Sequence, residues 1–487
     1  MNILRKKIML LPLGVSGLFS LNSCKQPIQE YNVIYILADD LGYGDLGCYG
    51  QKFIKTPNID KLASQGMIFT QHYAGSTVSA PSRSSLITGQ HTGHTYIRGN
   101  IGGLDGNEGQ EPIPSDTYTL AEMFKQAGYV TGAFGKWGLG SPGSEGDPTN
   151  QGFDDFFGYN CQALAHKHYP EHLWDNRKKN ILEGNNLVNK VHYAPDIIHS
   201  RALDFIKANH DQKFFAFLPY TLPHAELLVP EDSIIQRYRE IFHEEHPYNA
   251  KSGDYSPEGK SQTAYCSQTE PRAQFAAMVT RLDHYVGEVI AQLEYLGIRD
   301  KTIVIFTSDN GPHREGGADP DFFTSYGPLR GTKRDMWEGG IRVPMIASCP
   351  TLISQGAKSD HVSAFWDILP TFADMTGVKI NTQIDGISMM PALTGKGQQK
   401  QHEYLYWEFH EAGGKIAVRM GEWKGVKLDY AKNRDSSIKL FNLQNDLHED
   451  NNIADKHPDI VKKIEKIMSE AHTESALFNF GQKDGKM

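Results

Sequence analysis

Apolar and polar positions follow one another along this chain in blocks that predict strands and helices in alternation. Two continuous apolar runs, residues 32–38 and 301–308, each end in acidic or amide residues, as is typical of strands buried on both faces of a sheet. Apolar residues at helical spacing occupy residues 275–293, directly before the second run. This order predicts an α/β fold with a large, mixed but mostly parallel sheet flanked by helices.

Shorter elements fill the interval between these two strands. Thr119 and Glu122 have the spacing of a capping box that begins a helix, and Gly128 suits its end. Residues 130–134 follow as another predicted strand. Residues 230–269 are polar with little periodicity, so we expect an irregular insertion near the mouth of a site.

The pattern changes from about residue 395 onward. Short apolar runs there predict three strands, and a last amphipathic stretch predicts a closing helix: residues 404–409, 416–419, 440–443 and 459–470. We therefore expect a large domain over residues 24–394 and a smaller C-terminal antiparallel sheet-plus-helix subdomain over residues 395–487.

Residues 1–23 have the layout of a signal peptide, with basic residues before a short apolar run. A membrane anchor is the alternative, but the run over residues 8–21 is shorter than the ~20 residues that span a bilayer. The ending Leu-Asn-Ser-Cys24 resembles a bacterial lipobox, which implies an exported lipoprotein of the periplasm or outer membrane, lipid-anchored through Cys24. Export also permits disulfides in any of three full pairings of the other cysteines: Cys48, Cys161, Cys266 and Cys349.

The charge of the chain limits its partners. The net charge is −9 at pH 7, and it becomes −12 without residues 1–23, which carry three basic and no acidic side chains. This excess of acid argues against nucleic acid as a partner. An anionic substrate would have to be bound by a local cluster of Lys, Arg, His or metal, because the overall field repels it.

The most specific segment is residues 79–89, Ser-Ala-Pro-Ser-Arg-Ser-Ser-Leu-Ile-Thr-Gly. Pro81 suits the first turn of a helix and Gly89 its end, which places Ser79 at the positive N-terminal end. By itself, a serine at such a position is most often a plain helix cap. The whole string, however, resembles the signature of the formylglycine-dependent sulfatases of the alkaline phosphatase superfamily.

This resemblance implies that Ser79 is oxidised to formylglycine before the enzyme is active. A serine at this position, in place of cysteine, implies the bacterial sulfatase-maturing enzyme that serves serine-type sulfatases. The hydrated aldehyde carries two hydroxyl groups, of which one attacks sulfur and the other later expels sulfate. Unmodified serine has no second hydroxyl and would stay sulfated.

Oxygen ligands for a metal ion follow two of the predicted strands. Asp39 and Asp40 end one strand, and Asp309 and Asn310 end another. Such folds place their ligands at the carboxyl edge of the parallel sheet. An oxygen-only set suits calcium or magnesium better than zinc. The resemblance implies one calcium ion, held by these four residues and Ser79.

A local set of cationic side chains is also present, although each lysine taken alone is most often a solvated surface charge. By resemblance, Arg83 supports the formylglycine, and Lys136 and Lys333 bind the sulfate oxygens. His224 with Lys333 is implied to protonate the leaving alkoxide, and Asp309 to hold or deprotonate the attacking hydroxyl. Such groups would stabilise the charge that builds on the oxygens during transfer.

The chain departs from the family pattern at Gly138, where the family usually has a histidine credited with assisting sulfate elimination. Substitutes would be His166, His168 or His313, although a histidine in a loop is more often an ordinary polar residue. Sugar sites mix aromatic faces with charged hydrogen-bonding partners. On that basis we expect substrate contacts from a set of residues near the mouth of the site: Arg98, Asn100, His166, His168, His313 and His410.

The expected function is therefore hydrolysis of a sulfate monoester on a sulfated sugar of a polysaccharide or host glycan. One alternative is a phosphomonoesterase or phosphodiesterase of the same fold, because phosphate and sulfate are nearly isosteric. Metal stoichiometry would separate that alternative, since its members usually bind two transition metals. A second alternative is a glycan-binding relative without turnover, which Gly138 and the need to modify Ser79 leave open.

Overall fold

The computed structural model describes residues 30–102 and 108–480. From Tyr31 onward the chain forms one compact unit. The predicted signal peptide and Cys24 lie outside the described residues. Within them, every helix is too short or too polar to cross a membrane.

The main element is an eleven-stranded mixed sheet with the order β10-β2-β9-β8-β1-β7-β3-β4-β5-β6, in which β11 also pairs with β2. Its central strands β8, β1, β7, β3 and β4 run parallel, whereas β9, β5 and β6 pair in antiparallel fashion. The strands are β1 Asn32–Ala38, β2 Met67–Tyr73, β3 Val130–Lys136, β4 Asp155–Tyr159, β5 His172–Asp175, β6 Lys178–Ile181, β7 Phe214–Pro219, β8 Thr302–Ser308, β9 Arg342–Ser348, β10 Ala357–Ser359 and β11 Ser363–Ala364. The predicted mixed, mostly parallel sheet is confirmed.

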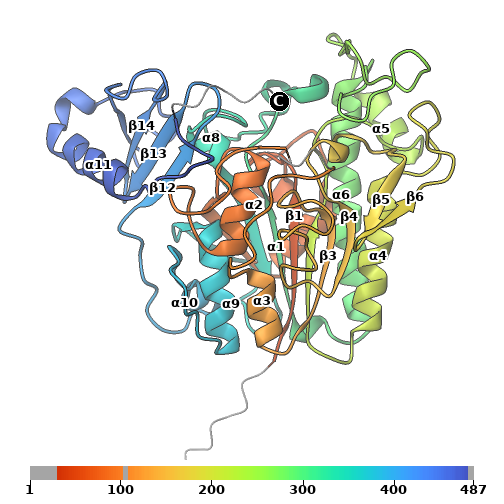
Figure 1. Cartoon of the computed structure of the whole chain (residues 1–487), viewed down its shortest axis with the longest axis horizontal. Helices are drawn as coiled ribbons and strands as arrows, with labels where there is room; N and C mark the ends of the chain where they lie inside the picture. The colour runs from red at the N-terminus through yellow and green to blue at the C-terminus, as the bar shows by residue number, and fades with distance from the viewer. Residues whose placement is uncertain (1–29, 103–107, 481–487) are drawn as a thin grey trace, which may run out of the picture. The chain divides into compact units, whose positions relative to one another are not determined.

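Helices cover both faces of this sheet (Figure 1). Alternate residues of β1 pack into two different cores, Ile34 and Ile36 with α4 and α6, and Val33 and Tyr35 with α2, α3 and α9. The helices are α1 Pro57–Ser64, α2 Ser79–Thr88, α3 Leu120–Gln126, α4 Ala194–Ala208, α5 Ser233–Ile241, α6 Pro271–Tyr295, α7 Pro320–Phe323, α8 Glu338–Ile341, α9 Ile368–Thr376, α10 Met390–Thr394 and α11 Pro458–Glu470. Burial on both sides explains why β1 reads as a continuous apolar run.

A second, antiparallel sheet forms near the C-terminus, with α11 packed against it (Figure 1). Its strands are β12 Leu405–Phe409, β13 Lys415–Met420, β14 Trp423–Lys427 and β15 Lys439–Asn442. The smaller sheet-plus-helix unit is thus confirmed, while its boundary at residue 395 stays a prediction. The sequence analysis missed β14, because Trp-Lys-Gly-Val-Lys contains only two large apolar residues.

Local signals located several elements closely. The capping box of Thr119 and Glu122 begins α3, as predicted. The insertion over residues 230–269 contains the helix α5, which Asp232 caps through its side chain, so this segment is less irregular than expected. The four described cysteines are all free, and none of the three pairings forms.

A buried cluster of charges connects the smaller sheet to the main one. Lys424 of β14 lies 3.0 Å from Glu338 at the start of α8 and 2.9 Å from Glu449, and none of these side chains is exposed. Arg342 of β9 also pairs with Glu338. Buried charges are tolerated only when each has a partner. Loss of any one charge in this cluster would therefore weaken the contact between the two sheets.

The cluster predicts a specific pH dependence of stability. Burial and the charge of Glu338 raise the pKa of Glu449 to about 7. The unfolded chain therefore ionises Glu449 at a lower pH than the folded chain, and this group costs stability as the pH rises from about 4.5 to about 7. Glu449→Gln is expected to flatten the decline in unfolding free energy between pH 5 and 7.5, by up to about 1.4 kcal/mol per pH unit.

Denaturant titrations at both pH values would measure this effect. Glu422→Gln, at an exposed position between β13 and β14, is the matched control and should keep the slope of the unmodified protein. An unchanged slope in Glu449→Gln would show that this carboxyl group ionises normally in the folded state.

Candidate functional site

The candidate site lies at the carboxyl edge of the central parallel strands, where α2 begins. Ser79 is the first residue of α2, and its Oγ donates to Asp39 Oδ1 at 3.0 Å. Asp39 directly follows β1, and its other oxygen accepts from Lys136 Nζ at 2.8 Å, at the end of β3. Lys136 Nζ also lies 3.3 Å from Ser79 Oγ. Three elements far apart in the sequence thus converge on one buried serine.

Four oxygen-bearing side chains predicted from the strand ends are brought together here. Carboxylate oxygens of Asp39, Asp40 and Asp309 all lie within 4.8 Å of one another. Asn310 Nδ2 donates to Asp40 Oδ1 at 2.6 Å, while its Oδ1 is buried without a hydrogen-bond partner. A buried unpartnered oxygen beside three carboxylates is suited to a hard cation, so the donor set fits calcium or magnesium.

Cationic side chains surround these carboxylates. Arg83 of α2 donates twice to Asp309 Oδ2, at 2.9 and 3.2 Å, and also to the Lys136 carbonyl. Lys333 Nζ donates to Asp40 Oδ2 at 2.8 Å. With Lys136, the three cations balance the three aspartates, so a divalent cation and a sulfate ester can enter without leaving a large net charge.

His224 and Lys333 form a hydrogen-bonded pair in this site. His224 Nδ1 donates to the Ala225 carbonyl, which leaves Nε2 as an acceptor 3.1 Å from Lys333 Nζ. Burial and the charge of Lys333 lower the pKa of His224 well below its ordinary value. The pKa of Lys333 is raised, because Asp40 and Glu315 outweigh the opposing effect of burial. The pair therefore consists of a protonated lysine and a neutral imidazole at neutral pH.

The pKa values of two aspartates in the site are shifted in opposite directions. Burial opposes charge on Asp39, but Lys136, Arg83 and Lys333 together lower its pKa well below its ordinary value. Burial and the charge of Asp39 raise the pKa of Asp309 to about 6. The site thus keeps one firmly ionised carboxylate beside one that changes protonation near neutral pH.

Of the three loop histidines, His166 and His313 lie beside His224. The ring of His166, at the end of the short 3-10 helix η2 Leu164–His166, stacks on His224 at 5.3 Å, and its Nδ1 donates to the Thr263 carbonyl at 2.8 Å. The ring of His313 also stacks on His224, with ring centroids at 5.5 Å. His168 is fully buried, and its Nδ1 hydrogen-bonds to the Leu228 carbonyl.

The other predicted substrate contacts are bound to protein groups. Arg98 is buried and donates to Glu408, at 3.0 Å, and to Thr473. His410 Nε2 hydrogen-bonds to the same Glu408 at 2.8 Å. Asn100 Oδ1 accepts from the amide of Ala80 at the start of α2. These residues link the smaller sheet to the region of Ser79, and their contact with substrate stays a prediction.

Two site residues escaped the sequence analysis. Tyr265 lies against both His166 and His224, with ring centroids at 4.9 and 6.0 Å. Glu315 lies 3.8 Å from Lys333 and also contacts His313. Neither residue belongs to a periodic pattern, and only the position of Tyr265 in the insertion near the mouth pointed to the site.

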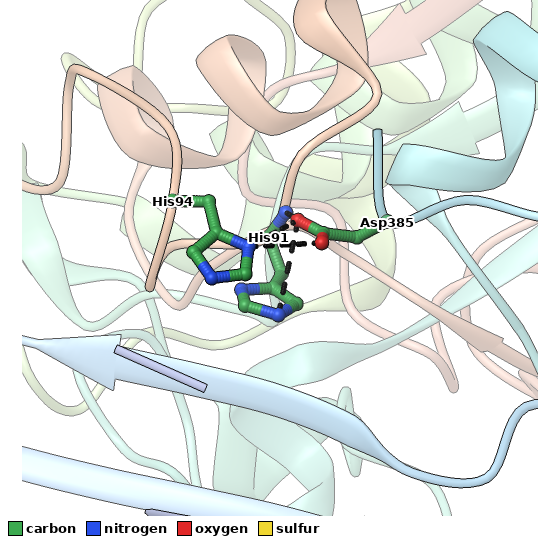
Figure 2. A group of neighbouring side chains, drawn as sticks. All are labelled: His91, His94 and Asp385. Carbon is green, nitrogen blue, oxygen red and sulfur yellow. Dashed lines mark hydrogen bonds and ion pairs between the residues drawn. The ribbon is translucent and has the colours of Figure 1, made fainter. Parts of the chain in front are cut away.

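A separate group of two histidines and one carboxylate lies beyond the far end of α2 (Figure 2). Asp385 accepts from His94 Nδ1 at 2.9 Å and from the backbone amide of His91, and its own amide donates to Gly89, the C-cap of α2. His91 Nδ1 accepts from the amide of Gly93, which leaves the proton of the neutral ring on Nε2. Because Nε2 then has no free lone pair for a metal, we interpret this group as a hydrogen-bonded clip that holds α2.

Comparison with known proteins gives two overlapping family matches. The family described as Sulfatase matches residues 31–378, and the family described as N-sulphoglucosamine sulphohydrolase, C-terminal, matches residues 331–474. The first match covers the main sheet and the site residues from Asp39 to Lys333.

Individual proteins are similar to this chain over most of its length. Human steryl-sulfatase is 31% identical over 436 residues, covering 77% of this chain and 71% of the relative. The N-acetylgalactosamine-6-O-sulfatase of Bacteroides thetaiotaomicron is 29% identical over 532 residues, covering 95% and 99%. The crystal structure of Ps i-CgsB in complex with k-i-k-neocarrahexaose aligns with a TM-score of 0.75 and 27% identity, covering 92% and 95%.

Proposed function

Since this chain belongs to the sulfatase family and is a sulfuric ester hydrolase, we propose that it removes sulfate from a sulfated sugar of a polysaccharide or host glycan, with Ser79, oxidised to formylglycine, as its nucleophile. The observation that carries the proposal is Ser79 itself. Ser79 is buried at the start of α2. Its Oγ donates to Asp39 Oδ1 and lies 3.3 Å from Lys136 Nζ. A sulfated sugar as the substrate is supported by the relative named N-acetylgalactosamine-6-O-sulfatase and by the similar structure in complex with k-i-k-neocarrahexaose.

The proposed metal ligands are the oxygen-bearing residues at the strand ends together with the side chain at position 79: Asp39, Asp40, Asp309, Asn310 and Ser79. When bound there, a calcium ion would supply positive charge that polarises the oxygens of the reacting groups. Arg83 holds Asp309 in place through two hydrogen bonds. Asp309 is proposed to hold or deprotonate the attacking hydroxyl.

Lys136 and Lys333 are proposed to bind the sulfate oxygens, and Lys333 with His224 to protonate the leaving alkoxide. Lys333 carries the proton, and His224 Nε2 accepts a hydrogen bond from it, which orients the ammonium group. An alkoxide leaving group of a sugar is strongly basic, so its departure depends on a proton donated in the transition state.

Lys333→Ala is therefore expected to lower kcat/KM for a sulfated sugar by about 10²–10⁴-fold. The loss should be smaller for an aryl sulfate, because a phenolate leaves without needing a proton. Comparing the two substrate types across Lys333→Ala and the exposed helical control Lys207→Ala measures the effect. Equal losses for both substrates would assign Lys333 to sulfate binding rather than to proton donation.

Several further features are proposed on sequence grounds. Residues 1–23 would direct export, and Cys24 would carry the lipid that anchors the protein in the periplasm or outer membrane. A serine-type maturing enzyme would act on Ser79 before folding is complete, because Ser79 is only 2% exposed in the folded chain. We also propose that residues 24–394 carry the catalytic site and residues 395–487 form the smaller subdomain.

The test is to co-express the chain with a serine-type maturing enzyme and to measure the mass of the peptide that contains Ser79. Oxidation to the aldehyde makes it about 2 Da lighter. Sulfate release is then measured on a panel of sulfated monosaccharides, with the corresponding phosphate monoesters as a second arm. Sulfate release that depends on the mass change supports the proposal.

The other outcomes favour the alternatives. Release of phosphate with little release of sulfate would indicate a phosphatase of the same fold. Binding of the sugars without release of either anion by oxidised protein would indicate a glycan-binding relative.

A further inference from the structure

Gly138 lies two residues after Lys136, and its surroundings are unusual. Its φ of +78° lies in the left-handed region, which residues with a side chain rarely adopt. A Cβ atom placed on Gly138 would lie 2.2 Å from Nε2 of Gln162. The amide of Gln162 therefore occupies the space that a side chain at position 138 would need.

Gln162 belongs to a loop that reaches the candidate site. This loop follows β4, which pairs with β3 in parallel, and the Asn160 carbonyl accepts from the amide of Gly138 at 3.0 Å. Further along the loop, His166 stacks on His224. The register of the two strands places Tyr159, directly before this loop, opposite Lys136.

Side-chain amide atoms of this loop lack hydrogen-bond partners within the described part of the protein. Gln162 Nε2 is buried and has no hydrogen-bond partner, and the same holds for both amide atoms of Asn160, which is fully buried. The backbone of Gln162 is fixed, since its amide donates to Gln110 Oε1 at 2.8 Å. A buried donor without a partner is costly, so a ligand or a water must supply an acceptor here.

We propose that Gln162 takes the place of the side chain missing at Gly138 and binds a sulfate oxygen through Nε2, alongside Lys136. An uncharged donor suits a site that already contains Lys136, because it adds a hydrogen bond without adding charge repulsion. This inference rests on the proposed function, because it takes the sulfate group as the ligand.

The test uses the full chain with unmodified Ser79, loaded with calcium, and inorganic sulfate as the probe in calorimetry. Gln162→Met keeps the shape and removes the donor, whereas Gln162→Glu replaces the donor with a negative charge. Sulfate should bind about tenfold or more weakly to Gln162→Met and more weakly still to Gln162→Glu. Gln444→Glu, exposed in the smaller sheet region, is the matched charge control and should bind normally.

Thermal unfolding of the same variants separates binding from folding. Replacing an unpartnered buried donor by an apolar group of similar shape should leave the melting temperature of Gln162→Met equal or higher. Sulfate affinity equal to that of the unmodified chain in both Gln162 variants would overturn the inference and leave water as the partner of Nε2. Sulfate binding needs no turnover, so calorimetry tests the role of Gln162 separately from the proposed function. The proposed function fails if mature protein releases no sulfate.

Discussion

Ser79→Ala is expected to lower kcat for sulfate ester hydrolysis by about 10⁵–10⁶-fold, the range seen when an enzyme loses its nucleophile. The side chain at position 79 contacts both Asp39 and Lys136. Alanine has no oxygen at this position to act as the nucleophile. Sulfate and calcium should still bind, because the other ligands stay in position. Sulfate release by matured protein, with calorimetry for both ions, measures the two effects together.

The fold should tolerate this change well. Ser79 Oγ donates to the Asp39 carboxylate, which keeps its hydrogen bond from Lys136, so we expect a loss of about 1 kcal/mol in unfolding free energy. Ser469→Ala, at an exposed position in α11, is the control for the same substitution. Residual hydrolysis within about tenfold of the unmodified enzyme would exclude Ser79 as the nucleophile and point to a water attacking the ester directly.

Lys424→Met is expected to reduce the unfolding free energy by about 3–5 kcal/mol. Lys424 is the cation shared by Glu338 and Glu449, and its loss leaves two buried carboxylates close together with fewer compensating charges. Arg342 and Arg419 remain near Glu338 but do not reach Glu449. Denaturant titration would measure the loss, with Lys439→Met on the exposed face of β15 as the control.

A double variant makes this prediction more specific. Combining Lys424→Met with Glu449→Gln removes one of the two carboxyl groups that Lys424 pairs with, so part of the lost stability should return. If Lys424→Met alone is as stable as the unmodified chain, the cluster does not hold the two sheets together.

Particular elements show how far local pattern alone can go. The run over residues 32–38 coincides with β1, because a strand buried on both faces must be apolar at every position. The capping box at Thr119 likewise located α3, since its two hydrogen bonds are made within one turn. The strand β14 was missed, because Lys424 is buried there and a buried lysine breaks the apolar pattern.

Some site residues could likewise be located from the sequence, whereas the partners of others could not. Asp39, Asp40, Asp309 and Asn310 were placed correctly at one sheet edge, because strand ends in a parallel sheet meet there. For Arg98 and His410, sequence reasoning expected contacts with substrate, and the structure pairs both with Glu408. The pair of Arg98 and Glu408 joins residues 310 positions apart, a separation that no local pattern reports.

By itself, the sequence determined several central strands, such as β1 and β8, the helix that begins at Ser79 and the residue types of the site. These depend on side-chain periodicity and on contacts between near neighbours in the chain. Only the tertiary structure decided which charges pair, that His166 lies on His224, and that Gln162 occupies the space beside Gly138. These facts depend on how distant segments pack, because burial converts a polar side chain from a solvated group into one that needs a particular partner.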